Sequence, residues 1–334
     1  MAKSLIFLQA PLKMAAVLNC YDNEKSQGNS VVIVLPARLK SMLDFITCLH
    51  VDSEVFVLED MVHRSLLNIP ANKRSISRNK ILINYLAGSN GRFFFTDLFD
   101  PDLALLLQAI NHLNPTQIQT KVDRQVGSDY EKLQNDVSVY HKICAKLFSK
   151  IYHSTFVACK VGFYLFYTFD NRVHKLPAID YSDTSIIERY RIKTINHSGK
   201  SVIFFSNPND GFFCTDDEYG MVSVDVVRFL QKKGYFVAAK GHPREGSEKH
   251  VDAICDYVIP GYIPAEFIDL KQFDFAIGFF STALCNASFV IKGYSLMKIP
   301  KISDRLQYER CMGFFDRCDN RVVFIGKFED MLFK

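Results

Sequence analysis

The stretch that decides the fold is Tyr235–Glu245, which reads YFVAAKGHPRE. Its first half is a short apolar run, typical of a strand buried on both faces of a sheet. Its second half turns polar at once, and Pro243 prevents further pairing in the sheet. In an open α/β sheet, ligands bind at the edge where parallel strands end. The stretch therefore predicts a buried strand that delivers Lys240 and His242 to a ligand site.

A second strand end has the same character. Phe275–Thr282 reads FAIGFFST, and Ile263–Glu266, between the two strands, reads IPAE. Ser281 and Thr282 would lie where this strand ends and a helix begins. Hydroxyl and backbone N–H groups at such a position form an anion site. We interpret the whole region as a nucleotide-phosphate pocket with a histidine proton donor.

The rest of the chain alternates strands and helices, which predicts an α/β fold with parallel sheets. In the first half, helical spacing is expected at Arg38–His50, at Ser75–Ala87, from Asp100 onward, and over the long stretch Asp129–His153. In the second half, the capping-box pattern at Thr215–Glu218 should begin a helix that Gly234 ends. The expected strands are Ser4–Ala10, Ser30–Leu35, Glu54–Leu58, Arg92–Thr96 and Gln117–Val122, then Val202–Phe205, Tyr235–Ala239, Tyr257–Ile259, Phe275–Ile277 and Val322–Ile325.

The polar, irregular stretch 171–198 suggests a domain boundary, with the linker at Thr194–Lys200. We expect two Rossmann-like domains, an acceptor-side domain over residues 1–195 and a nucleotide-binding domain over residues 200–334. Facing each other across a cleft, they would form a GT-B-like architecture.

Composition narrows the class of protein. The 334 residues carry a formal net charge of +4, with no dense run of Lys or Arg, which does not favour a nucleic-acid partner. The nine cysteines have no metal-ligand spacing and suggest free thiols in a reducing compartment. The start has no leader pattern, and no apolar stretch is long enough to span a bilayer. We expect a cytoplasmic protein.

Each site residue also has a structural interpretation. His242 can cap a loop, Glu266 can complement its own helix dipole, and Ser281 can be an N-cap. The ordered set is more specific than any member, because an imidazole, an ammonium, a carboxylate and two hydroxyls would meet at one edge.

The motifs Lys-x-His-Pro, Pro-Ala-Glu and Gly-Phe-x-Ser-Thr-x-Leu resemble those of bacterial lipooligosaccharide sialyltransferases and are similar to those of bacterial polysialyltransferases. The resemblance is strong over Ser201–Ser288. In the first half it rests on strand order and on the aromatic run Tyr164–Thr168.

The resemblance implies a metal-independent, inverting transfer of sialic acid, or a related nonulosonic acid, from a CMP donor to a bacterial surface glycan such as lipooligosaccharide or capsule. It implies no cofactor and no metal. His242 would protonate or hydrogen-bond the departing phosphate, and Glu266 would bind the ribose. The implied CMP-binding set is Lys240, Pro243, Arg244, Glu266, Gly278, Phe279, Ser281 and Thr282.

The base that deprotonates the acceptor hydroxyl stays open. In the first domain, the acidic motif of related enzymes has its nearest match at Val122–Ser128, which departs from the pattern. In the second domain, Asp210, Asp216, Asp217 and Glu218 are candidates. We favour Asp217 and keep Asp210, although Asp217 also fits as first-turn charge of a capped helix.

Other functions and partners remain open. A CDP-glycerol-type glycerophosphotransferase has a similar His-Pro element, and a catalytically retired nucleotide-binding protein would explain the altered acidic motif. The basic face of Lys142, Lys146 and Lys150 has two interpretations: a solvated helix face, or a surface for anionic lipid or a lipid-linked acceptor, which would place the protein peripherally on the inner face of the bacterial inner membrane. Dimers occur in the resembling family, so a homodimer is a further expectation.

Overall fold

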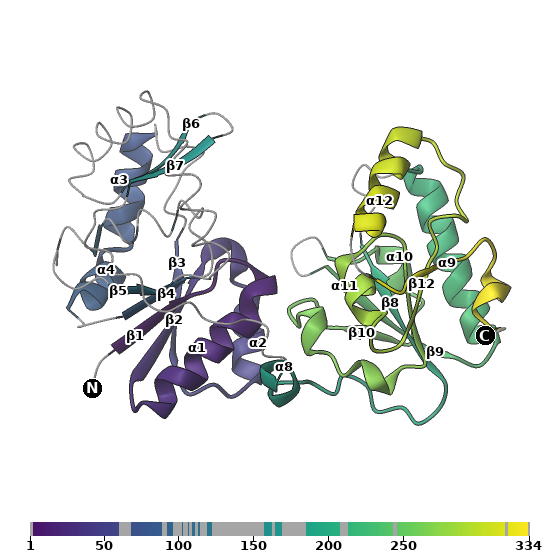
Figure 1. The fold of residues 1–334 in the computed structure, drawn as a ribbon, viewed down its shortest axis with the longest axis horizontal. Coiled ribbons are helices and arrows are strands. Elements are labelled where there is room, and N and C mark those ends of the chain that lie inside the picture. Colours follow the sequence, from purple (N-terminus) through teal and green to yellow (C-terminus); the bar gives the residue numbers. More distant parts are fainter. Residues whose placement is uncertain are drawn as a thin grey trace. The chain divides into compact units, whose positions relative to one another are not determined.

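The computed structural model describes residues 3–59, 68–88, 92–95, 102, 106, 109–110, 113, 119–121, 157–161, 164–168, 185–207, 213–242, 246–317 and 320–332. The chain divides into two compact units, Met1–Ile186 and Ile187–Lys334 (Figure 1). Each unit is built on its own parallel sheet.

The first unit contains the five strands that the sequence predicts. They pair in parallel in the order β3-β2-β1-β4-β5. β2, which lies between β3 and β1, is buried from Val31 to Pro36, as its β-branched run predicts. The bounds are β1 Lys3–Phe7, β2 Ser30–Pro36, β3 Glu54–Leu58, β4 Arg92–Phe95 and β5 Gln119–Lys121.

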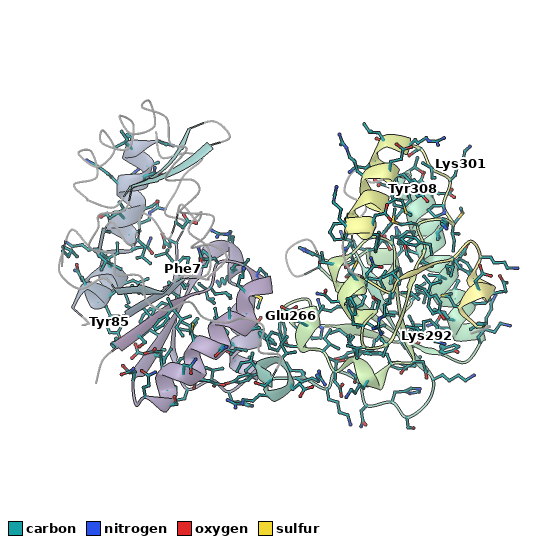
Figure 2. The ribbon with its side chains drawn as sticks, in the orientation of Figure 1. Phe7, Tyr85, Glu266, Lys292, Lys301 and Tyr308 are labelled. Carbon is teal, nitrogen blue, oxygen red and sulfur yellow. The ribbon has the colours of Figure 1, made fainter. Side chains whose placement is uncertain are left out.

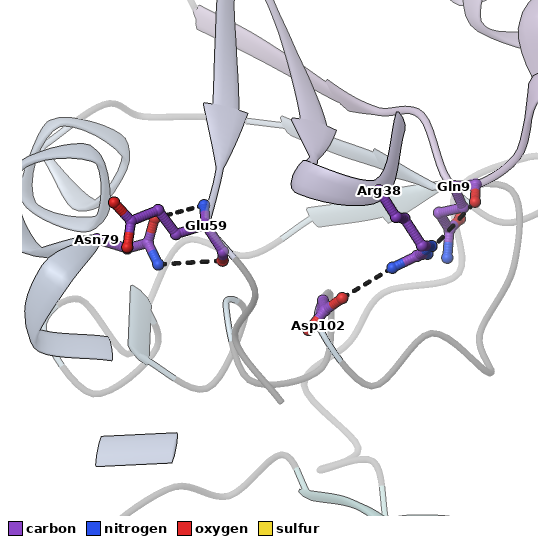
Figure 3. Close-up of polar contacts among 5 residues, drawn as sticks. All are labelled: Gln9, Arg38, Glu59, Asn79 and Asp102. Atoms are coloured by element: carbon purple, nitrogen blue, oxygen red, sulfur yellow. Dashed lines mark hydrogen bonds and ion pairs between the residues drawn. The ribbon is translucent and has the colours of Figure 1, made fainter. Parts of the chain in front are cut away.

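Helices connect these strands. The helix predicted at Ser75–Ala87 begins earlier, because Pro70 opens α3 at Ile69, and it divides at Asn79. The Asn79 side chain pairs with the backbone of Glu59, accepting from its N–H at 3.1 Å and donating to its carbonyl at 3.2 Å (Figure 3). The bounds are η1 Pro11–Lys13, α1 Met14–Ser26, η2 Ala37–Leu39, α2 Met42–Cys48, α3 Ile69–Arg78 and α4 Lys80–Ala87.

The aromatic run forms β7, Tyr164–Thr168, which pairs antiparallel with β6, Val157–Val161. The polar stretch after it, expected to be irregular, contains the short helix α8, Ser185–Arg189. The helix predicted at Asp129–His153 and the basic face on it lie outside the described residues.

The second unit has a six-stranded parallel sheet in the order β10-β9-β8-β11-β12-β13. Five of its strands lie where the sequence predicts them. The sequence did not predict the sixth strand, β12, because Lys292-Gly293-Tyr294-Ser295 is short and contains no β-branched residue. The bounds are β8 Ser201–Ser206, β9 Phe236–Gly241, β10 Tyr257–Ile259, β11 Phe275–Gly278, β12 Lys292–Ser295 and β13 Val323–Phe324.

Helix α9, Asp216–Lys232, begins where the capping pattern predicts, since the Thr215 hydroxyl accepts the Glu218 N–H at 3.3 Å. It ends before Gly234, whose φ of +79° suits glycine. Tyr219, Val226 and Leu230 on α9 are buried with Val202, Phe204 and Val237 of the sheet. The remaining helices are α10 Lys249–Asp252, η3 Ala265–Phe267, η4 Leu270–Gln272, α11 Thr282–Ala287, α12 Arg305–Arg317 and η5 Phe328–Met331.

Numbered from the first strand of each sheet, both units follow the order 3-2-1-4-5, and the second adds a sixth strand. This is the Rossmann order. The predicted class, α/β with two Rossmann-like units on parallel sheets, is confirmed.

Residues just before and within the predicted linker bond the second unit. The Ile192 N–H donates to the Phe267 carbonyl at 2.7 Å, and the Ile195 N–H donates to the Gln272 side chain at 3.0 Å. Among the described residues, no helix combines the length and the apolar character needed to cross a lipid bilayer.

Candidate active site

The site lies at the carboxyl edge of the second sheet, where the strand order reverses between β8 and β11. In open α/β sheets, ligands bind outside this edge, at the point where the strand order reverses. In the register, Ser206 at the end of β8 pairs with Gly241 of β9, and Phe205 pairs with Gly278 of β11. The strand carrying His242 and the strand leading to Ser281 therefore end level, about 10 Å apart at about 4.8 Å per strand.

A tight loop presents His242. Its N–H donates to the Gly246 carbonyl at 2.7 Å, and the Gly246 N–H donates back at 2.9 Å. Gly246 has a φ of +83°, and a Cβ on Gly241 would lie 2.7 Å from the Gly246 carbonyl carbon. The loop therefore requires both glycines. His242 itself is half-buried.

Buried groups hold this loop against the sheet. The hydroxyl of Ser206, which is fully buried, accepts the Glu248 N–H at 3.1 Å. Glu248 in turn caps α10 by accepting the Val251 N–H at 2.9 Å. The end of β8 thus fixes the chain just after the His242 loop.

The Lys240 side chain is not exposed at the edge of the sheet. Its side chain is only 2% exposed, and its ammonium donates to the Gly241 carbonyl and, at 3.3 Å, to the Gly261 carbonyl. Burial lowers the pKa of Lys240 to about 8, against the opposing effect of the Glu266 charge. The resemblance implies that Lys240 binds the nucleotide. In the structure its ammonium instead donates to two backbone carbonyls beneath the site.

Glu266 lies on the one-turn helix η3, after Pro264 (Figure 2). Burial raises the pKa of the Glu266 carboxyl, while its own backbone N–H and the Lys240 ammonium lower it. Among the described residues, the donor that bonds this carboxylate is the backbone N–H of Glu266 itself. Its remaining acceptor positions are suited to hydroxyl donors of a ligand.

The residues after β11 supply two hydroxyl groups, and the helix that they begin, α11, packs against η3, which carries Glu266. Ser281 is the N-cap of α11, and its hydroxyl accepts the Ala283 N–H at 3.1 Å. Thr282, the first residue of α11, is exposed. Gly278 is needed for close approach, since a Cβ there would lie 3.2 Å from the Phe205 carbonyl oxygen.

Phe279 has a structural role beside these groups. Its ring is buried and lies 4.3 Å, centroid to centroid, from the ring of Tyr219. The Tyr219 hydroxyl donates to the Asn207 carbonyl at 2.7 Å, which connects α9 to the residue after β8.

Of the base candidates, Asp217 is exposed in the first turn of α9. Neighbouring Glu218 accepts the Lys301 N–H at 3.0 Å, and so has a structural partner. Asp210, Pro243 and Arg244 lie outside the described residues.

Sequence reasoning missed the two glycines of the His242 loop and the bond from Ser206. The spacing Gly-His-Pro-Arg-Glu-Gly at residues 241–246 carried a signal, because glycines flanking a proline turn indicate special backbone geometry. No group of three or more His, Cys, Asp and Glu side chains suited to a metal ion occurs in the part of the chain that the structure describes.

Comparison with solved structures gives distant similarities. A sialyltransferase GT-B domain from Photobacterium damselae has 13% identity and a TM-score of 0.47, covering 97% of this chain and 100% of that chain. The spinosyn forosaminyltransferase SpnP has 12% identity and a TM-score of 0.45, covering 96% and 85%. The ADP-heptose lipopolysaccharide heptosyltransferase II of E. coli has 12% identity and a TM-score of 0.39, covering 89% and 84%.

No curated protein matches the chain in sequence. The family model of the α-2,8-polysialyltransferases (POLYST) matches residues 105–297, more than half of the chain. That match includes β8, β9, η3, β11 and α11, the elements that carry the described site residues. The chain belongs to the α-2,8-polysialyltransferase family.

Proposed function

We propose that the protein is an inverting, metal-independent glycosyltransferase that moves sialic acid, or a related nonulosonic acid, from a CMP donor to a bacterial surface glycan. Family membership supports glycosyl transfer. The observation that supports the finer proposal is the strand register, which ends β9 before His242 and β11 before Ser281 and Thr282 at the same sheet edge, together with the packing of η3, which carries Glu266, on α11.

His242 acts on the leaving group. As the bond to the sugar breaks, the electron pair stays on the phosphate oxygen of CMP, where negative charge develops. A protonated imidazole donates a hydrogen bond or a proton to that oxygen. Because CMP leaves as one phosphate monoester, an imidazole and a few neutral donors suffice to stabilise it.

Ser281 and Thr282 bind the same phosphate. The Thr282 hydroxyl is exposed at the edge, and Gly278 keeps the backbone free of a side chain beside it. Hydroxyl and backbone N–H groups donate to phosphate oxygens without adding net charge.

Glu266 binds the ribose. A ribose hydroxyl donates well to an ionised carboxylate, and the Lys240 charge favours that ionised form. Ribose recognition by the half-buried Glu266 carboxylate would distinguish a nucleotide from free phosphate.

Asp217, with Asp210 as alternative, is the proposed base for the acceptor hydroxyl. Asp217 is exposed at the N-terminal turn of α9, which follows β8 along the chain. A base on the face opposite the departing CMP would give inversion at the anomeric carbon.

The partners follow from this chemistry. The donor is a CMP-activated nonulosonic acid, and the acceptor is a glycan or glycolipid such as lipooligosaccharide or capsule. Action in the cytoplasm, with peripheral contact at the inner membrane, and a homodimer belong to the same proposal.

A donor panel tests the function. The protein is incubated with CMP-sialic acid, CDP-glycerol or a UDP-sugar and a set of sialylated glycans, with and without EDTA, and products are read by mass spectrometry. We expect transfer from CMP-sialic acid that EDTA leaves intact. Turnover of CDP-glycerol alone favours a glycerophosphotransferase, and CMP binding without any turnover favours a retired nucleotide-binding protein.

A further inference from the structure

The buried ammonium of Lys240 lies beneath the candidate site and has no contact with the phosphate in the proposed function. Lys240 is the fifth residue of β9, between Phe205 of β8 and Ile259 of β10 in the sheet register. Lysine is rarely buried to this degree without a partner for its charge. Its contacts therefore call for an explanation.

The first contact fixes the backbone of the proposed acid. Lys240 donates to the Gly241 carbonyl, which belongs to the peptide unit whose N–H is that of His242. That N–H donates to the Gly246 carbonyl at 2.7 Å. Both polar groups of the Gly241–His242 peptide unit are thereby bonded. This fixes the orientation of the backbone from which the His242 side chain extends.

The second contact fixes the approach to the carboxylate. Lys240 also donates at 3.3 Å to the carbonyl of Gly261, in the loop between β10 and η3. A turn closes this loop, since the Ile263 N–H donates to the Pro260 carbonyl at 3.1 Å. Three residues after Ile263 the chain presents Glu266, so one side chain bonds the loops of both groups.

The charges form a coupled pair. Burial lowers the pKa of Lys240 and raises the pKa of Glu266, and each charge works against that trend in the other. Around Lys240, the neighbouring strands bring the uncharged Phe205, Ser206 and Ile259, and η3 brings Glu266. Among the described residues, Glu266 is the charged group that acts on Lys240, and Lys240 is the one that acts on Glu266.

We propose that Lys240 is a positioning residue: by bonding the Gly241 and Gly261 carbonyls, its ammonium joins the His242 loop to the loop that leads to Glu266, without touching the donor. This rests on the proposed function only for the identity of the ligand. The junction of the two loops is a property of the free protein.

The first experiment measures the junction without any ligand. In protein with ¹³C-labelled lysine, the Lys240 resonance should titrate near pH 8, the value to which burial lowers its pKa. In Glu266→Gln the titration should move to lower pH, because the carboxylate that favours the charged ammonium is gone. A Lys240 resonance that titrates at the ordinary value of about 10.4, or at the same pH in both proteins, overturns the proposal.

The second experiment measures CMP affinity by calorimetry between pH 4 and 9. Affinity should fall on the acid side as Glu266 is protonated. In Lys240→Met, this acid limb should move up by about one pH unit, since an opposite charge nearby is lost. Glu266→Gln should remove the part of the limb that is due to Glu266 and leave the part that is due to the CMP phosphate, whose second pKa is about 6. Lys271→Met, which removes an exposed lysine from η4 of the same unit, is the matched control and should leave the limb in place.

The outcomes separate the two proposals. A lysine titration that depends on Glu266, in a protein with no affinity for CMP, leaves the junction standing and contradicts the function. CMP binding with the same acid limb in Lys240→Met and the wild type supports the nucleotide site and contradicts the junction. If Lys240→Met fails to fold, the lysine titrations of wild type and Glu266→Gln decide the matter.

Discussion

The two units share a strand order but differ at the edge where their strands end. In the first unit, polar contacts between side chains of distant elements hold this edge. Arg38, after β2, donates to the Asp102 carboxylate at 2.8 Å and to the Gln9 carbonyl, after β1, at 3.4 Å (Figure 3). In the second unit, glycines and a buried ammonium bonded to backbone shape the edge.

The two units show that strand order fixes where the carboxyl edge of a sheet lies, but not which chemical groups stand at that edge. Glycine at residues 241 and 278 lets backbone segments approach closely, and Gly246 supplies a φ of +83°, so that the chain can present His242 and the residues after β11. The charges of Arg38 and Asp102 neutralise each other within the first unit. This difference supports the proposal that the donor binds at the edge of the second unit.

The largest expected effect is on turnover. His242→Ala removes the proposed proton donor, and kcat for CMP release from CMP-sialic acid should fall by about 10²–10⁴-fold. CMP affinity should change only a few-fold. His250→Ala, at a surface histidine on α10 whose side chain is 77% exposed, is the control and should behave as wild type. A His242→Ala enzyme with normal kcat would move the acid elsewhere.

The second effect tests the role of glycine at the edge. Gly241→Ala would place a Cβ 2.7 Å from backbone of Gly246, so the loop must shift, and we expect unfolding free energy to fall by about 1–3 kcal/mol. Activity should fall with it. Gly313→Ala, in α12 with open space around its Cβ position, should instead stabilise by about 0.5–1 kcal/mol. Urea unfolding of both variants makes the comparison, and equal stabilities would mean that the loop tolerates a side chain.

The third effect lies in the first unit. Arg38→Met removes the ion pair with the buried Asp102, and we expect the first unit to lose about 1–2 kcal/mol, since Arg38 is itself partly exposed. Donor hydrolysis should stay within about threefold of wild type. Arg78→Met is the control, because its pair with Glu59 spans 3.9 Å between two exposed side chains. Hydrogen exchange of β1 and β2 amides reports the change; a loss of donor hydrolysis without faster exchange would assign chemistry to this edge as well.

The smallest effect concerns α9, whose first turn carries Asp217. Thr215→Ala removes the hydroxyl that accepts the Glu218 N–H, and should cost about 1 kcal/mol. Thr194→Ala, which removes a hydroxyl that accepts from the Gln272 side chain at 3.0 Å outside any helix, is the comparison for loss of one hydrogen bond to a threonine that is not a cap. Thermal unfolding measures both, and a Thr215→Ala protein as stable as wild type would show that the cap contributes little.

Most strands and the start of α9 were readable from the sequence because their signals are local. A run such as Val31–Leu35 is apolar throughout, and Thr215 stands three residues before the acidic Glu218. Strand β12 was not readable: Lys292–Ser295 becomes a strand by pairing with β11, on the side opposite β8. The division of the helix at Asn79 likewise depends on Glu59, twenty residues away.

The sequence by itself determined two α/β units, the order of the motifs, and which residue types stand at the ends of β9 and β11. The tertiary structure decided what Lys240 does. Its carbonyl partner at Gly261 and its charge partner Glu266 come from segments that only the pairing of β9 with β10 and the fold of η3 bring to it. The ammonium of a lysine at a strand end can face solvent or the interior. Which of the two occurs depends on neighbouring strands that are distant in sequence, so no local pattern predicts it.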